Sequence, residues 1–178
     1  MVGLRSFRCY RRLERPYTRR SKYKKKNYVR SFPNHKIARF DMGTKRLYTH
    51  ILKFVAKGTL QIRHNALESA RLVVLNRMTE NLGTNYFLKL YPFPHHALRE
   101  NKMLGGAHAD RLQTGMAHSF GKVVNTAAQV MQGGDIFTAY VDKEGVEHAK
   151  KALESASPRM PGKYAVIIQE NKKKIIPG

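Results

Sequence analysis

The chain has 178 residues, and its 34 Lys and Arg against 12 Asp and Glu give a formal net charge of +22. This length favours one domain with tails, and 42% hydrophobic residues are enough to build a core. These values exclude a purely disordered basic tail. Cys9 is the only cysteine, which excludes an internal disulfide and multi-cysteine metal sites. We expect neither a secretory signal nor a membrane helix, because no apolar run is long enough for one.

The charge predicts a polyanionic partner, because a surface this basic repels itself unless something negative is bound. Nucleic acid is the first candidate and an anionic membrane the second. Residues 1–40 hold 14 Lys and Arg against Glu14 alone, while the other 138 residues carry a net +9. The cations of this arm that we expect to bind RNA are Arg5, Arg8, Arg11, Arg12, Arg15, Arg19, Arg20, Lys22, Lys24, Lys25, Lys26 and Arg30.

Aromatic residues alternate with these charges along the arm, and such rings can stack on bases. The arm has no helical or strand period, so residues 1–34 are interpreted as an extended segment that orders on its target. A solvated tail is the plainer alternative. A membrane-surface helix fits poorly, because the arm lacks an apolar stripe. The aromatic residues are Phe7, Tyr10, Tyr17, Tyr23, Tyr28 and Phe32.

From residue 36 onward the pattern becomes globular. Residues 36–42 and 47–55 are predicted to be strands. Residues 65–82 are predicted to form a helix, with Asn65 as its cap, Glu68 completing a capping-box-like pair and Gly83 just past its end. Arg71 and Arg77 lie off its apolar stripe and are predicted to be free to bind RNA. The stripe comprises Leu67, Ala70, Val74, Leu75, Met78 and Leu82.

The second half repeats this mixture. A strand is predicted over 84–91, a long irregular segment over 92–121, and two strands over 122–131 and 135–141 joined as a hairpin at Gly133-Gly134. Lys122 at the start of the first of these strands is a further RNA-binding candidate. A helix over 143–156 capped by Asp142, a strand over 163–169 and a basic tail over 171–178 follow. This order predicts an α+β fold over residues 35–170, with two helices on a mainly antiparallel sheet.

The irregular segment contains only incomplete versions of enzyme motifs. The run from Gly115 to Lys122 has five residues between its glycines rather than four, so it does not fit a phosphate-binding loop. The adjacent histidines His95 and His96 lack further ligands for a metal. Glu100 and Asp110 are ten residues apart with nothing to orient them as an acid/base pair. The triad Asp110, His118 and Ser119 lacks a nucleophile elbow. We therefore expect no enzyme activity, cofactor or metal.

Several blocks of residues resemble one family. They are Arg8-Cys9-Tyr10-Arg11, Leu67-Glu68-Ser69-Ala70-Arg71, Arg99-Glu100-Asn101-Lys102-Met103-Leu104 and, above all, Ala109-Asp110-Arg111-Leu112-Gln113-Thr114-Gly115-Met116 followed by Phe120-Gly121-Lys122. The chain resembles the universal large-subunit ribosomal protein L-sixteen family in its archaeal/eukaryotic form, also called L-ten-e. The resemblance runs from about Arg8 to Ile168. The Pro-Phe-Pro-His-His stretch and the lone cysteine are nearer the archaeal pattern.

The resemblance implies a hammerhead-like two-layer α/β sandwich and a structural role in the large subunit of the cytoplasmic ribosome. The implied partners are large-subunit rRNA, tRNA, other ribosomal proteins and 5S rRNA, with no membrane and no small-molecule substrate. It further implies that the loop near 103–115 reaches toward the peptidyl-transferase centre and supports tRNA positioning. The residues assigned to this tRNA-proximal loop are Arg99, Asn101, Lys102, Gly105, Gly106, Asp110, Arg111, Gln113 and Gly115.

Two other functions remain as alternatives. The charge alone would suit a DNA-binding chromatin protein, although no helix-turn-helix, zinc finger or basic zipper is visible. An RNA-processing enzyme would need an acid/base or metal constellation that the motifs do not supply.

Overall fold

The computed structural model describes residues 33–101 and 121–171, together with Ser6, Arg8, Tyr10, Leu13, Lys25, Val29 and Ser31. The predicted division into an arm over 1–34, one domain over 35–170 and a tail over 171–178 stays a prediction. None of the helices in the described residues is long and apolar enough to span a membrane.

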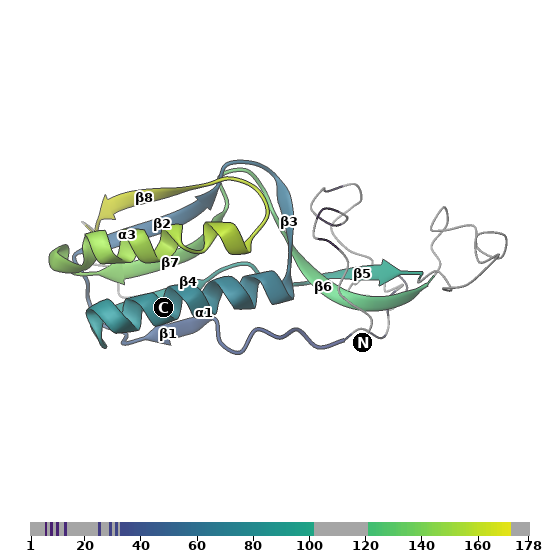
Figure 1. Cartoon of the computed structure of the whole chain (residues 1–178), viewed down its shortest axis with the longest axis horizontal. Coiled ribbons are helices and arrows are strands. Elements are labelled where there is room, and N and C mark those ends of the chain that lie inside the picture. The colour runs from purple at the N-terminus through teal and green to yellow at the C-terminus, as the bar shows by residue number, and fades with distance from the viewer. Residues whose placement is uncertain are drawn as a thin grey trace.

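Two antiparallel sheets organise the described chain (Figure 1). The larger has five strands in the order β1-β4-β7-β2-β8, and the smaller has three in the order β3-β6-β5. Every pair in both sheets is antiparallel. The strands are β1 (Asp41–Gly43), β2 (His50–Ala56), β3 (Leu60–Arg63), β4 (Tyr86–Leu90), β5 (His96–Glu100), β6 (Lys122–Val130), β7 (Asp135–Val141) and β8 (Tyr164–Glu170).

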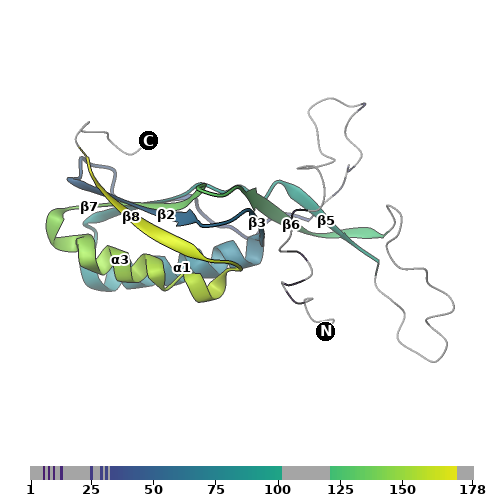
Figure 2. The ribbon, with the colours of Figure 1, turned by 90° about the horizontal axis from the view of Figure 1, so that it is seen from above.

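Two helices cover one face of the five-stranded sheet (Figure 2). They are α1 (His64–Leu82) and α3 (Val146–Glu154), which pack against each other. Short 3-10 turns flank α3 at η3 (Lys143–Gly145) and η4 (Ser157–Arg159). The predicted α+β class, with two helices layered on antiparallel sheet, is therefore confirmed.

The core lies between this helical layer and the sheet. On α1, Leu67, Ala70, Val74 and Met78 are fully buried, as the predicted stripe requires, while Leu75 and Leu82 are half-buried. Alternate strand residues meet them, because side chains in a strand point to opposite faces in turn. These residues include Leu52 and Phe54 of β2, Leu88 of β4, and Ala139 and Val141 of β7.

The ends of the helices follow the prediction only in part. Gly83 ends α1 with φ at 59°, and its N–H donates to Thr79 O at 3.0 Å, so the predicted C-terminal glycine is confirmed. The predicted N-cap is wrong, because α1 begins one residue earlier and has no side-chain cap. Asp142 stands at the N-cap position of the turn η3, as predicted for the residue before 143, but its side chain makes no capping hydrogen bond. Its carboxylate accepts a hydrogen bond from Arg46 Nη2 at 2.6 Å instead.

Three strand predictions need correction. Only Asp41 and Met42 of the predicted strand 36–42 lie in a strand, β1, because the backbone N–H groups of Lys36 and Ala38 donate to side chains of α1 rather than to a neighbouring strand. The segment 92–121 is not irregular throughout, since β5 lies within it. Strands β6 and β7 are not a hairpin, because each belongs to a different sheet and the chain crosses between sheets at Gly133-Gly134.

Candidate nucleic-acid interface

A two-stranded ribbon projects from the body of the molecule (Figures 1 and 2). It consists of β5 and the first half of β6, which pair from His96 opposite Ala127 to Glu100 opposite Lys122. The ribbon ends at the pair Glu100 and Lys122, and Asn101 and Gly121 are the next residues of the chain on either side. The segment 102–120, which contains most of the block that resembles the ribosomal family, is therefore joined to the body through this ribbon.

Gly121 fixes how closely the two strands approach at the tip. Its φ is +101°, and a Cβ built there would lie 2.6 Å from Glu100 O and 2.8 Å from Asn101 N. Such a separation is a steric clash with backbone, and a positive φ also disfavours a residue with a side chain. Only glycine fits at this position without moving the opposite strand.

The structure brings three of the predicted site residues together at the ribbon. Arg99 lies opposite Val123, Lys122 lies opposite Glu100, and Asn101 directly follows the end of β5. Lys122 is exposed, and Arg99 is half-buried. The ribbon thus carries a guanidinium and an ammonium group next to the ends of segment 102–120.

The base of the ribbon presents a polar face formed by β3 and β6. Gln61 lies opposite Gln129, and the amide of Gln129 donates to Gln61 Oε1 at 3.3 Å. Gln61 Nε2 donates in turn to the backbone oxygen of Tyr10 at 2.7 Å. The guanidinium of Arg63 lies 5.6 Å from the centre of the Tyr10 ring, within cation–π range. A residue of the basic arm therefore contacts the face that leads to the ribbon.

His64 ties the segment before β1 to this same region. The imidazole is buried, and its Nδ1 accepts a hydrogen bond from the backbone N–H of Lys36 at 2.8 Å. Burial lowers the pKa of His64, and a side-chain hydrogen bond with Asn125 of β6 opposes that shift in part. The nearby charges of Lys36 and Arg63 lower the pKa further. The neutral imidazole of His64 is thus favoured in the folded protein, and it leaves Nδ1 able to accept the hydrogen bond from Lys36.

Aromatic rings gather where the five-stranded sheet passes into the ribbon. Phe40 and Phe93 are stacked with centroids 5.7 Å apart, and His35 meets both rings edge-on. Phe93 is 47% exposed. An exposed ring held against a second ring is a surface on which an unpaired base can stack.

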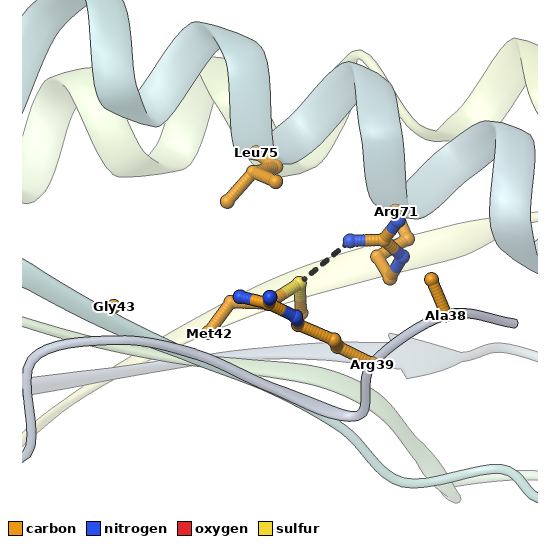
Figure 3. Close-up of a pocket in the computed structure, with 6 residues that line it drawn as sticks. All are labelled: Ala38, Arg39, Met42, Gly43, Arg71 and Leu75. Atoms are coloured by element: carbon orange, nitrogen blue, oxygen red, sulfur yellow. Dashed lines mark hydrogen bonds between the residues drawn. The ribbon is translucent and has the colours of Figure 1, made fainter.

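Arg71 does not lie on the surface, so its predicted RNA contact is wrong. Only 4% of the residue is exposed. Its Nη2 donates to Glu68 Oε1 at 2.5 Å. Its Nη1 donates to Met42 Sδ at 3.2 Å (Figure 3). Glu68 also accepts from the backbone N–H of Ala38 at 3.3 Å. These contacts use the guanidinium to hold the segment before β1 against α1.

A cavity of about 300 Å³ lies beside this cluster, between β1 and α1 (Figure 3). Ala38, Met42, Gly43 and Leu75 line it together with Arg39 and Arg71. Its only charged groups are these two arginines, so it holds no acid–base pair. Among the described ranges, no group of three or more His, Cys, Asp or Glu could hold a metal ion.

The other predicted site residues are either exposed or lie outside the residues that the structure describes. Arg77 is exposed on α1, and Arg8 and Lys25 are exposed in the arm. The remaining predicted site residues lie outside the described residues. They are Arg5, Arg11, Arg12, Arg15, Arg19, Arg20, Lys22, Lys24, Lys26 and Arg30 of the arm, and Lys102, Gly105, Gly106, Asp110, Arg111, Gln113 and Gly115 of the loop.

Gln61 and Arg63 are not among the residues predicted from the sequence. A signal was present, because the run Leu60-Gln61-Ile62-Arg63 alternates apolar and polar residues as a half-buried strand does. Four residues between two stronger elements are too few to stand out by periodicity alone.

Comparison with known proteins identifies the family. The sequence profile of the family described as "Ribosomal protein L16p/L10e" matches residues 18–167. Three archaeal proteins, each named "Large ribosomal subunit protein uL16", align over nearly all of both chains. That of Archaeoglobus fulgidus is 44% identical over 165 residues, covering 92% of this chain and 91% of its own. That of Metallosphaera sedula is 42% identical over 171 residues, covering 94% and 95%.

The third, from Staphylothermus marinus, is 42% identical over 179 residues and covers 99% of each chain. These matches favour the ribosomal hypothesis over the chromatin and enzyme alternatives, because members of this family are structural rather than catalytic proteins. The chain belongs to the L16p/L10e family of large-subunit ribosomal proteins.

Proposed function

We propose that this chain binds large-subunit rRNA beside the tRNA path and near 5S rRNA, and that segment 102–120 supports tRNA positioning. The observation that carries the proposal is the projecting ribbon, whose two strands end where that segment begins and ends. Arg99 and Lys122 supply positive charge at this point. A paired ribbon holds a functional segment more firmly than an unpaired loop would.

The arm and the ribbon would act on one region of RNA. Tyr10 of the arm contacts Gln61 and Arg63 at the ribbon's base, so this residue lies at the same end of the molecule as the ribbon. Contacts from arginine and lysine to phosphates supply affinity but little specificity for the RNA sequence. Specificity would come from the shape of a folded RNA that fits between arm and ribbon, with Phe93 available to an unpaired base.

The glycines and polar residues of the loop would then serve the tRNA end. Gly105, Gly106 and Gly115 permit close approach of backbone to RNA. Arg111, Lys102 and Gln113 can donate hydrogen bonds to phosphates or base edges. The loop in this proposal positions an RNA end and transfers no group, which agrees with a family of structural proteins.

Two measurements on ribosomes test the proposal separately. The tagged chain should sediment with the large subunit in moderate salt, and its crosslinks should fall on rRNA near the tRNA path. Sedimentation as free protein would contradict rRNA binding. Replacing 102–120 by a short Gly-Ser linker should leave the chain on the subunit and weaken tRNA binding there. Unchanged tRNA binding by such subunits would contradict the role of the loop alone.

A further inference from the structure

Strand β8 forms one edge of the five-stranded sheet, and within the described ranges no strand pairs with its outer side. It pairs with β2 over seven consecutive residues, from Tyr164 opposite Ala56 to Glu170 opposite His50. Figure 2 shows β8 as the long yellow arrow at the border of the sheet, above α3.

The hydrogen bonds to β2 determine which backbone groups of β8 face outward. Asn171 N donates to Thr49 O, and Lys57 N donates to Lys163 O, both at 2.9 Å. Residues of an antiparallel strand alternate between bonding the neighbour and pointing away from it. The odd-numbered residues 163–171 therefore bond β2. The N–H and C=O groups of the even-numbered residues, Tyr164, Val166, Ile168 and Glu170, point to the free edge.

The edge formed by β8 lacks the features that usually prevent an edge strand from pairing with another strand. Edge strands of soluble proteins are commonly short, bulged, or interrupted by proline or lysine. Strand β8 has seven residues, no proline or lysine, and an unbroken register with β2. The opposite edge differs, because β1 has only three residues and ends at Gly43.

Exposed apolar side chains flank the free edge on both faces of the sheet. Ile167 is 44% exposed and Ile168 is 45% exposed. Ile168 lies opposite buried Leu52 on the helix-covered face, so Ile167, opposite Lys53, lies on the other face. An added strand would cover both side chains as well as the backbone groups.

The charge of this side argues against RNA as its occupant. Residues 135–171, which form β7, α3 and β8, hold five Lys and Arg against six Asp and Glu, a net charge of −1. The rest of the chain therefore carries +23. On β8 itself the only charged residue is Glu170. RNA binding depends on phosphate neutralisation, which the side chains of β8 itself do not offer.

We propose that an extended segment of another large-subunit protein pairs with β8 as a sixth strand of this sheet. Backbone bonds to residues 164, 166, 168 and 170 would supply affinity, and Ile167 and Ile168 would provide apolar contacts. A basic segment suits Glu170, which is exposed at the end of the strand. A second copy of this chain is disfavoured, because each copy carries +22. The inference rests on the proposed ribosomal function, since it takes the partner from the same subunit.

Amide hydrogen exchange, measured on the free protein and on intact large subunits, tests the pairing. The amides of residues 166, 168 and 170 should exchange quickly in the free protein and slow by at least tenfold in the subunit. The inward amides of residues 165, 167 and 169 are the internal control and should be protected in both. Outward amides that stay unprotected in the subunit would overturn the proposal, while the chain's presence there would leave its ribosomal function intact.

Crosslinking identifies the occupant. A photoreactive benzoylphenylalanine in place of Ile167 should crosslink, within the intact subunit, to a peptide of a different ribosomal protein. The same group in place of Leu72, which is 44% exposed on α1, is the matched control and should not capture that peptide. Crosslinks to rRNA, to a second copy or to this chain's own arm would overturn the proposal.

A backbone variant separates pairing from folding. Ile168→Pro removes an outward N–H and no bond to β2, so the free protein should fold and the variant should still enter subunits. Its subunits should lose the protection of residues 166 and 170 and the crosslink from position 167. If the Ile168→Pro subunits kept the protection and the crosslink, the proposed pairing of a sixth strand with β8 would be contradicted. Ile168→Thr, which keeps a β-branched side chain and the N–H, should retain them.

Discussion

Arg71 and Glu68 form a nearly buried ion pair one helical turn apart on α1. Two hydrogen bonds join them, Nε to Oε2 at 2.8 Å and Nη2 to Oε1 at 2.5 Å, and their side chains are 5% and 16% exposed. The hydrogen bonds and charge of Arg71 lower the pKa of Glu68. Because Glu68 also binds the N–H of Ala38, the pair fixes the chain that enters β1.

Removing Arg71 should therefore destabilise the fold rather than weaken RNA binding. Arg71→Ala leaves Glu68 without its partner in a poorly solvated place, and we expect a loss of about 3–5 kcal/mol in the free energy of unfolding. Urea denaturation measures this loss. Arg77→Ala is the matched control on the exposed side of the same helix and should change stability by less than about 0.5 kcal/mol. Equal effects of the two variants would contradict the buried role.

Acid should destabilise the protein through His64. Its pKa is lowered in the folded state, so as pH falls below about 6.5 the unfolded chain takes up a proton first. The contribution of neutral His64 to the free energy of unfolding is complete above that pH. It is lost as the pH falls from there to the lowered pKa of the folded state. The free energy of unfolding should thus decrease between pH 7 and 5, a range above that in which Glu68 titrates. Denaturant titrations at several pH values measure this slope.

His64→Asn is the control for that slope. The Asn side chain keeps an oxygen acceptor near the position of Nδ1 and does not titrate. The variant should be less stable at pH 7, because it loses buried ring area, but its stability should vary less between pH 7 and 5. An unchanged slope in His64→Asn would assign the pH dependence to other groups.

Gly121→Ala should distort the tip of the ribbon. The added Cβ meets the backbone of Glu100 and Asn101 below 3 Å, so the two strands must separate where segment 102–120 begins and ends. We expect subunits carrying this variant to bind tRNA several-fold more weakly in a filter-binding assay. Gly133→Ala is the matched control, because Gly133 also has a positive φ, +76°, but a Cβ there meets nothing within 4 Å. Its subunits should bind tRNA as the wild type does.

The salt dependence of rRNA binding should locate the interface. Lys122→Gln and Arg99→Gln at the ribbon should each reduce the slope of log K against log salt by up to about one unit. Lys150→Gln, an exposed position on α3, lies on the neutral side of the molecule and should leave the slope unchanged. A reduction by Lys150→Gln equal to that at the ribbon would place RNA on both sides and contradict this interface.

Local patterns made much of the fold predictable. The stripe on 65–82 marked the buried face of α1, and Gly83 marked its end, because helical periodicity and a left-handed terminal residue are properties of short segments. Alternation likewise located most of β2, β4, β7 and β8. Which strands pair depends on contacts far apart in the chain, so the sequence did not reveal that β6 and β7 enter different sheets.

By itself, the sequence determined the fold class, the basic arm, the excess charge and, through the blocks around Asp110 and Arg99, the ribosomal family. Only the tertiary structure decided what individual charges do. Arg71 and Arg77 are six residues apart on one helix and look alike in sequence, but the chain before β1 covers one and leaves the other in solvent. The same is true of β8, which lies at the end of the sheet and pairs on its outer side with no strand of the described residues. Burial and edge position depend on the complete packing of the chain, which short-range pattern does not encode.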